Sequence, residues 1–446
     1  MALQPVTDQV NKGYTDMSIL EFIVNLFRQP ALFIGIIALI GYLLMKEDIN
    51  KTIIGSIKAA AGLAILLWGV GFMFQGLQPI GTVLAKTVGV KPLEVTVGTS
   101  KIIRQYGTEI GIAMIVMFLT NLFLARVTKM KYIYLTGQLY LFVTWILTGI
   151  FAYTWGLSGI PLALVVGVVS GIYVTIQQWY TAKFALAINP KKDYVLGHIC
   201  SLGVLITSLI FTKGGKQLER PSHVRSMEEM TLPKKLQWIG ETTGLLFVLF
   251  LVIYLVLIGL NYPECLKLAT AAGMHPVVWA IMQSLTFTAG FAVLILGVQL
   301  LVENLIPAFK GIALKLVPGA LPGLDVPMFY VFAPKTTAIT GVIGIIAQVA
   351  FALIVMALGY PYFIFAPSAW VWFHAACAGV FGNHFGGIRG AITGAIITAL
   401  LMVIGQMILT PILGPIIGDY FMWGGDPDLQ IYGSIIAWLG KMVTGH

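Results

Sequence analysis

Charged side chains are scarce in this sequence of 446 residues. Asp, Glu, Lys and Arg make up 10% of it, whereas a soluble domain carries roughly 25%. None of the four occurs in 132–182, 268–302, 336–388 or 390–418, and each of these stretches exceeds the roughly 20 residues that cross a bilayer. The composition excludes an ordinary soluble globular protein and predicts a polytopic membrane protein.

Cysteines and cofactor motifs are also scarce. The three cysteines, Cys200, Cys265 and Cys377, are far apart and lie in or beside apolar segments, which favours packing roles over a disulfide framework or a metal site. We find no Walker loop, HExxH, GxSxG or cysteine–histidine cluster. We therefore expect no cofactor, no metal and no enzymatic activity by this chain alone.

Acidic residues are fewer than basic ones, 18 against 27, which gives a formal net charge of +9. In a membrane protein such an excess marks cytoplasmic loops, so we expect no nucleic-acid binding. The longest polar segment, 213–236, is rich in Lys and Arg. We interpret it as a basic cytoplasmic loop that sets orientation, with docking of a cytosolic partner as the alternative.

Apolar windows long enough to cross a membrane recur along the chain. They are 31–45, 59–78, 110–125, 132–155, 158–178, 243–261, 276–302, 336–359, 361–381, 388–412 and, more weakly, 428–440. This pattern predicts an all-α polytopic membrane protein with roughly eleven transmembrane helices.

Two apolar segments contain residues that break helices. The stretch 196–212 is short and contains two glycines, and 317–334 is rich in proline and glycine. Irregular backbone is tolerated at membrane depth only where protein or a water-filled cavity satisfies its polar groups. We therefore expect re-entrant hairpins near 194–212 and 315–335, the first of which keeps its two basic flanks on one side.

Internal similarity suggests two related halves. GFMFQGLQPIGTVLAKTVGVKPLEV from Gly71 resembles GVQLLVENLIPAFKGIALKLVPGALPGLDV from Gly297, with proline and lysine in the same order. The pairing predicts two inverted repeats, approximately 29–180 and 241–420, and a third hairpin near 86–104. Chance similarity between apolar segments is the alternative.

Several polar residues in apolar surroundings are candidates for function. Asp325 follows a segment broken by proline and glycine, where a buried acid is costly and a functional role is the default hypothesis. Its carboxylate can accept hydrogen bonds from two neighbouring hydroxyls of a sugar or polyol, although it could instead cap a half-helix. Glu94 is its repeat mate, and surface exposure is the alternative there. His198 opens the first hairpin, and Gln138 lies on an uncharged helix, so each is either satisfied structurally or binds substrate.

These segments resemble the membrane-spanning enzyme IIC component of the phosphotransferase system for L-ascorbate and, more distantly, the galactitol type. The specific stretches are LIPAFKGIALKLVPGALPGLDVPMFYVFAP and GVFGNHFGGIRGA, supported by the LTG and LGH motifs. The resemblance implies a single unit over 1–446 with core and scaffold domains. It also implies a homodimer in the lipid of the bacterial inner membrane that moves substrate by an elevator mechanism.

The resemblance further implies substrate contacts at Asp325, at His198 with its neighbour Ile199, along Gln138 to Phe142, and at Glu94, Val95 and Thr96. The chain departs from the ascorbate pattern at three of these positions. Gln138 stands where the family has histidine, and Ile199 and Phe142 stand where it has glutamine. A changed set of hydrogen-bonding groups should change the preferred pattern of hydroxyls.

The leading hypothesis is a permease subunit that translocates L-ascorbate or a related sugar acid or polyol, which cytosolic IIB phosphorylates with phosphate relayed by IIA. A second hypothesis is a proton-coupled secondary transporter in which Asp325 and Glu94 carry protons. A third is a membrane-embedded enzyme acting on lipid-linked sugars, with Asp325 and His198 as acid and base.

Overall fold

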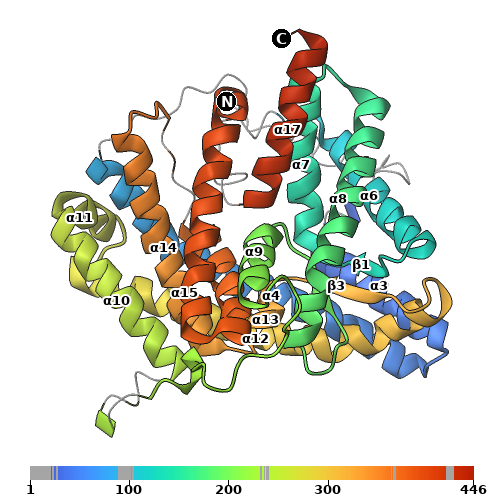
Figure 1. Cartoon of the computed structure of the whole chain (residues 1–446), viewed down its shortest axis with the longest axis horizontal. Helices are drawn as coiled ribbons and strands as arrows, with labels where there is room; N and C mark the ends of the chain where they lie inside the picture. The colour runs from blue at the N-terminus through green and yellow to red at the C-terminus, as the bar shows by residue number, and fades with distance from the viewer. Residues whose placement is uncertain are drawn as a thin grey trace, which may run out of the picture.

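The computed structural model describes residues 29–88, 105–231, 241–362, 368–417 and 426–445, together with positions 22, 25, 26, 102, 234, 235, 237 and 364. Figure 1 shows the arrangement of the elements in space. The helices are α3 (Pro30–Met45), α4 (Ile49–Val88), α6 (Gly107–Val127), α7 (Gly137–Thr154), α8 (Gly159–Ile188), α9 (Ser201–Phe211), α10 (Thr242–Leu260), α11 (Tyr262–Ala271), α12 (Pro276–Lys315), α13 (Pro327–Tyr330), α14 (Pro334–Ala357), α15 (Ser368–Ile417) and α17 (Pro427–Thr444), and a 3-10 turn, η1, spans Met227–Glu229. The strands are β1 (Tyr132–Tyr134), β2 (Val195–Leu196) and β3 (Leu321–Leu324).

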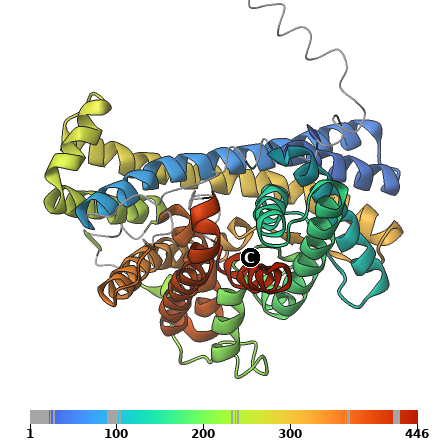
Figure 2. The ribbon, with the colours of Figure 1, turned by 90° about the horizontal axis from the view of Figure 1, so that it is seen from above.

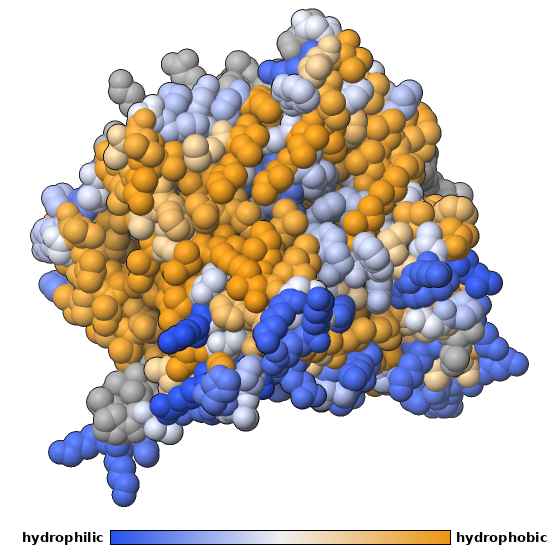
Figure 3. Space-filling model, in the orientation of Figure 1, coloured by the Kyte–Doolittle hydropathy of each residue, from blue (hydrophilic) through white to orange (hydrophobic). Residues whose placement is uncertain are grey.

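The helical membrane class is confirmed. Within the described residues, eight helices are long and apolar enough to cross a membrane. Apolar side chains cover most of the face shown in Figure 3, whereas hydrophilic residues gather along its lower edge. This division matches a protein that exposes an apolar surface to lipid and a polar edge to water.

The predicted apolar windows correspond to helices, with two differences. The sequence predicts one helix over 132–155, but the first residues of this window form β1 and α7 begins only at Gly137. Much of 361–381 and all of 388–412 share α15, which is interrupted at Gly387, where φ is 60° and ψ is −149°. Two adjacent windows therefore join through a sharp change of direction without an intervening polar loop.

The two longest unbroken helices, α4 and α12, form one layer of the molecule. Each has 40 residues and an internal proline, and Figure 2 shows them running side by side along one edge. Glycines spaced seven apart on α4 face α12: an added Cβ would lie 2.5 Å from Leu301 N at Gly62, 2.4 Å from Leu294 N at Gly69 and 2.8 Å from Phe287 N at Gly76. The antiparallel pair packs backbone to backbone, as small residues allow in membranes.

A small parallel sheet lies among the helices and was not expected from the sequence. Its strand order is β1-β3-β2, and both neighbours of β3 run parallel to it. The three strands come from distant parts of the chain. At two to four residues each, they are too short to show the alternation by which strands are recognised.

The predicted hairpins and repeats stay predictions. α9 has 11 residues, about 16 Å of helix at 1.5 Å per residue, which is too short to cross a bilayer of roughly 30 Å. The segment predicted as the 315–335 hairpin contains β3 and the short helix α13. The third predicted hairpin, 86–104, lies almost wholly outside the described residues.

The predicted basic loop 213–236 packs against the ends of two helices in its described part. Glu228 accepts a hydrogen bond of 2.6 Å from the backbone N–H of Thr336 in the first turn of α14. Asn383 of α15 accepts one of 2.8 Å from the backbone N–H of Met227. These contacts anchor η1 beside the break in α15.

Candidate substrate-binding site

The candidate site is built where the three parallel strands end. Gln138 follows β1, His198 follows β2 and Asp325 follows β3 directly. Because the carboxyl ends of parallel strands meet at one edge of a sheet, three residues distant in the sequence lie together. The side-chain hydroxyl of Thr136 donates a hydrogen bond to the carbonyl of Gly197, which ties the ends of β1 and β2 to each other.

The outer edges of this sheet are closed by side-chain amides. Asn121 of α6 accepts a hydrogen bond of 2.8 Å from Tyr134 N and donates one of 3.1 Å to Tyr132 O on β1. On the other side, Gln177 of α8 donates a hydrogen bond of 3.2 Å to Leu196 O on β2. Open strand edges are costly where water is absent, so these amides allow the sheet to exist inside the helical shell.

Close packing fixes the loop that carries His198. The backbone N–H of Gly197 donates a hydrogen bond of 2.8 Å to Leu324 O on β3. A Cβ at Gly197 would lie 2.8 Å from the carbonyl carbon of Gly323. Glycine is therefore required here, because any side chain would push β2 away from β3 and move His198 with it.

The three polar residues form a connected cluster around Asp325. The side-chain amide of Gln138 donates a hydrogen bond to Oδ2 of Asp325, and Nε2 of His198 lies 3.5 Å from Oδ1. The backbone N–H of Val326 donates a third contact, of 2.7 Å, to Oδ1. Asp325 is only 8% exposed, so these donors supply much of the stabilisation that a buried carboxylate needs.

The cluster forms the polar floor of a cavity of about 190 Å³. This volume is below the roughly 300–1,000 Å³ of drug-sized ligand sites, and it suits a molecule of monosaccharide size. The walls are apolar and come from α4, α7, α13 and α15: Leu67, Val70, Phe74, Leu139, Phe142, Val326, Pro327, Trp370 and Phe373. Among the described residues, no Lys or Arg lines the cavity.

Aromatic rings form much of the wall. The ring of Trp370 packs edge-on against Phe142 at 5.4 Å and against Phe74 at 5.1 Å between centroids. Phe74 also stacks on Phe373 at 6.2 Å. Rings held in this way give a rigid apolar surface against which the C–H face of a sugar can pack.

The structure brings together four of the predicted site residues, Asp325, His198, Gln138 and Phe142. Ile199 is fully buried and is not among the residues that line the cavity. Glu94, Val95 and Thr96 lie outside the described residues.

Sequence reasoning missed the contributions of α4 and α15, including Phe74, Trp370 and Phe373. The aromatic run WVWFH in 370–374 was a visible signal for one of these walls. The apolar residues of α4 gave no such signal in the sequence, because they cannot be told apart from other lipid-facing or packing residues.

Comparison with known proteins identifies the family of this chain. Residues 25–428 match the family model described as the PTS system sugar-specific permease component. The chain is also 24% identical, over 387 residues, to the ascorbate-specific PTS system EIIC component of Mycoplasma pneumoniae. That alignment covers 76% of this chain and 57% of the relative, so the chain spans little more than half of the relative's length.

Proposed function

Because the chain belongs to the family of sugar-specific permease components of the phosphotransferase system, we propose that its cavity binds a small polyhydroxylated substrate for transport across the bacterial inner membrane. Such a component is a transport subunit and not an enzyme by itself. The observation that carries the proposal is the buried carboxylate of Asp325, held by Gln138 and His198 in a cavity whose walls are otherwise apolar.

The chemistry of the cluster suits a pair of neighbouring hydroxyls. A carboxylate only accepts hydrogen bonds and has about four lone-pair positions on its two oxygens. Gln138 and His198 contact the two oxygens of Asp325 in the structure and use some of these lone-pair positions. Two substrate hydroxyls would donate to Asp325 in their place, and the released amide and imidazole would then bond to other substrate oxygens.

We propose L-ascorbate or a related sugar acid or polyol as the substrate. The support is the similarity to an ascorbate-specific component and the small volume of the cavity. The family's cytosolic IIB protein would then transfer phosphate, relayed through IIA, to a substrate hydroxyl that this chain positions. Gln138, Ile199 and Phe142 replace groups expected for ascorbate itself, so a different pattern of hydroxyls is part of the proposal.

We propose an elevator movement within a homodimer, and the placement of the cavity supports the movement. All three polar residues come from the ends of the sheet, whereas Leu67, Val70 and Phe74 come from the long α4–α12 layer. The cavity therefore lies at a boundary between a layer that would serve as scaffold and a core that would move. Sliding the core along this apolar boundary would break few hydrogen bonds, because α4 contributes only apolar side chains to it.

Transport into membrane vesicles tests the proposal. Vesicles containing the protein are loaded with the general phosphocarriers, the cognate IIB and IIA proteins and phosphoenolpyruvate, and receive labelled ascorbate or galactitol outside. The proposal predicts phosphorylated substrate inside and no effect of an uncoupler. Accumulation of unmodified substrate that an uncoupler abolishes would instead establish the proton-coupled alternative.

A further inference from the structure

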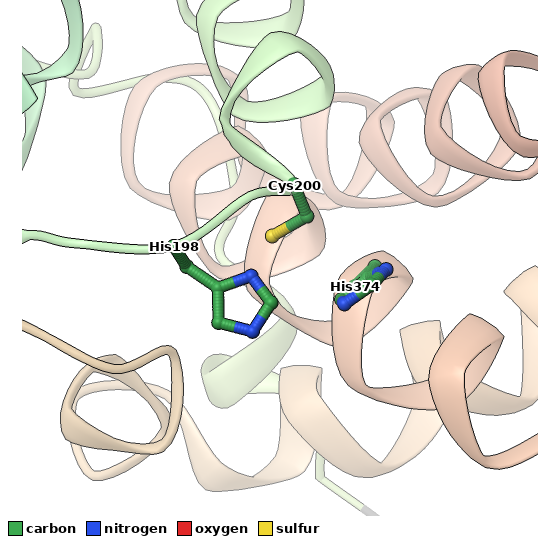
Figure 4. Close-up of side chains that lie close together, drawn as sticks. All are labelled: His198, Cys200 and His374. Atoms are coloured by element: carbon green, nitrogen blue, oxygen red, sulfur yellow. The ribbon is translucent and has the colours of Figure 1, made fainter. Parts of the chain in front are cut away.

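Two histidines and a cysteine converge next to the cavity. His198 and Cys200 extend from the loop after β2 toward His374 of α15, as Figure 4 shows. One candidate ligand atom from each of the three lies within 4.8 Å of the others. All three side chains are buried, with His198 3% exposed and the other two 0%. Ligands of a tetrahedral zinc ion lie roughly 3.4–3.8 Å apart, so a contraction of at most about 1.4 Å would complete the contacts.

Each histidine also faces a buried carboxylate. Nε2 of His198 lies 3.5 Å from Oδ1 of Asp325, and Nε2 of His374 lies 3.4 Å from Oδ1 of Asp426. Metal-binding histidines commonly direct one ring nitrogen to a carboxylate and bind the ion through the other. Nδ1 of His198 is buried without a hydrogen-bond partner among the described residues. This nitrogen can therefore bind an ion.

A second thiol lies within reach of the first. Cys377 is fully buried on α15, three residues after His374, and its thiol lies near that of Cys200. Residues three apart share one face of a helix, so His374 and Cys377 approach the loop together. Two imidazoles and two thiols are a common ligand set for zinc in proteins.

The buried carboxylates depend on the two histidines for ion pairing. Asp325 and Asp426 are 8% and 1% exposed, and their ion pairs within the described chain are with the two histidines alone. Neither carboxylate oxygen of Asp426 accepts a hydrogen bond from the described residues. Buried charge is costly unless it is paired, and a metal ion on the other nitrogen of each ring would fix the remaining N–H toward the carboxylate.

We propose that His198, Cys200 and His374 bind a zinc-like divalent ion, with Cys377 as the fourth ligand. Binding releases the proton of each ligating thiol to solvent, and the cavity at His198 gives the ion a route to the site. With Nδ1 on the metal, Nε2–H of His198 donates toward Asp325, so the ion fixes the tautomer on the cavity floor. The inference does not depend on the proposed function, because it concerns ion binding without transport.

Cobalt binding to the purified full-length protein tests this site. Protein in detergent is stripped with a chelator and titrated with Co²⁺ under reducing conditions, and zinc is then added as competitor. We expect one ion per chain, visible ligand-field absorption, a thiolate-to-cobalt charge-transfer band, and loss of these signals on zinc addition. No bound ion in folded protein, or an ion bound without the charge-transfer band, would overturn the proposal.

Single substitutions distinguish the residues that bind the metal ion from those that only lie near it. Cys200→Ser should remove or weaken the charge-transfer band, and Asp426→Asn should weaken binding about 10- to 100-fold through the orientation of His374. Cys265→Ser is the matched control, because Cys265 is also a buried cysteine but lies on α11. Thermal unfolding identifies any variant that fails to fold, and His374→Gln then provides the ligand test. Unchanged binding in folded His374→Gln would contradict the assignment.

Discussion

The side-chain amide of Gln138 donates a hydrogen bond to Asp325, which lies 187 residues away in the sequence and follows a different strand. This contact both satisfies a buried carboxylate and holds α7 against the end of β3. A substrate that binds Asp325 must replace it. The strength of the hydrogen bond between Gln138 and Asp325 therefore affects how tightly the substrate binds.

Replacing Gln138 should weaken binding without unfolding the protein. In Gln138→Leu the substrate loses an amide partner, and a lost buried hydrogen bond costs about 1–3 kcal/mol. We expect the dissociation constant of the labelled substrate to rise about 5- to 150-fold. Gln78→Leu is the control, because Gln78 is exposed on α4. Equal substrate affinities in the two variants would show that Gln138 does not contact the substrate.

The aromatic wall should contribute through packing. Phe142 lines the cavity, and the apolar face of a sugar that packs against its ring buries the equivalent of up to about two CH₂ groups, worth about 0.8 kcal/mol each. Phe142→Ala should therefore raise the dissociation constant about 2- to 12-fold, measured by equilibrium binding. Phe123→Ala, at a ring that is 63% exposed on α6, should leave it unchanged. A larger effect from Phe123 than from Phe142 would place the substrate elsewhere.

A single methyl group at Gly197 should disrupt the site by forcing β2 and β3 apart. Gly197→Ala places a Cβ 2.8 Å from the backbone of Gly323, so β2 and β3 must separate and His198 must move. Overpacking typically costs about 1–3 kcal/mol, and we expect lower thermal stability together with lost uptake. At Gly71 on α4 a Cβ meets nothing within 4 Å, and Gly71→Ala should retain both. Normal uptake by Gly197→Ala would show that the geometry of this loop is not required.

Asp428 should be a structural carboxylate and not a substrate ligand. It accepts hydrogen bonds of 2.8 Å from Ser201 N and 3.0 Å from Leu202 N at the start of α9, and one of 3.1 Å from the hydroxyl of Tyr173. Asp428→Ala leaves these buried donors unpaired, at about 1–3 kcal/mol each.

The measurement for Asp428 is thermal unfolding in detergent, with and without substrate. We expect a clear fall in the unfolding temperature of Asp428→Ala and a smaller one in Asp428→Asn, which keeps one acceptor oxygen. A normal unfolding temperature with abolished binding would instead make Asp428 part of the site.

The sequence predicted the membrane class and several site residues, and the reason is energetic. Asp325, Gln138 and His198 stand out because polar groups in apolar segments are costly to bury. Their meeting was not predictable, since strands of two to four residues show no periodicity. The candidate ion site was hidden in the same way, because His198 and Cys200 precede His374 and Cys377 by more than a hundred residues and match no spacing motif.

In the proposed function, Asp325 binds the hydroxyls of the substrate. The most direct test is equilibrium binding of labelled ascorbate and galactitol to purified protein and to Asp325→Asn, with Asp193→Asn as the control at a carboxylate bonded to Asn189. A hydrogen bond to a charged group contributes about 1.5–3 kcal/mol, so Asp325→Asn should lose at least about tenfold in affinity for the bound substrate while unfolding cooperatively. Asp193→Asn should bind like the unaltered protein. Unchanged affinity in folded Asp325→Asn would show that Asp325 does not bind the substrate.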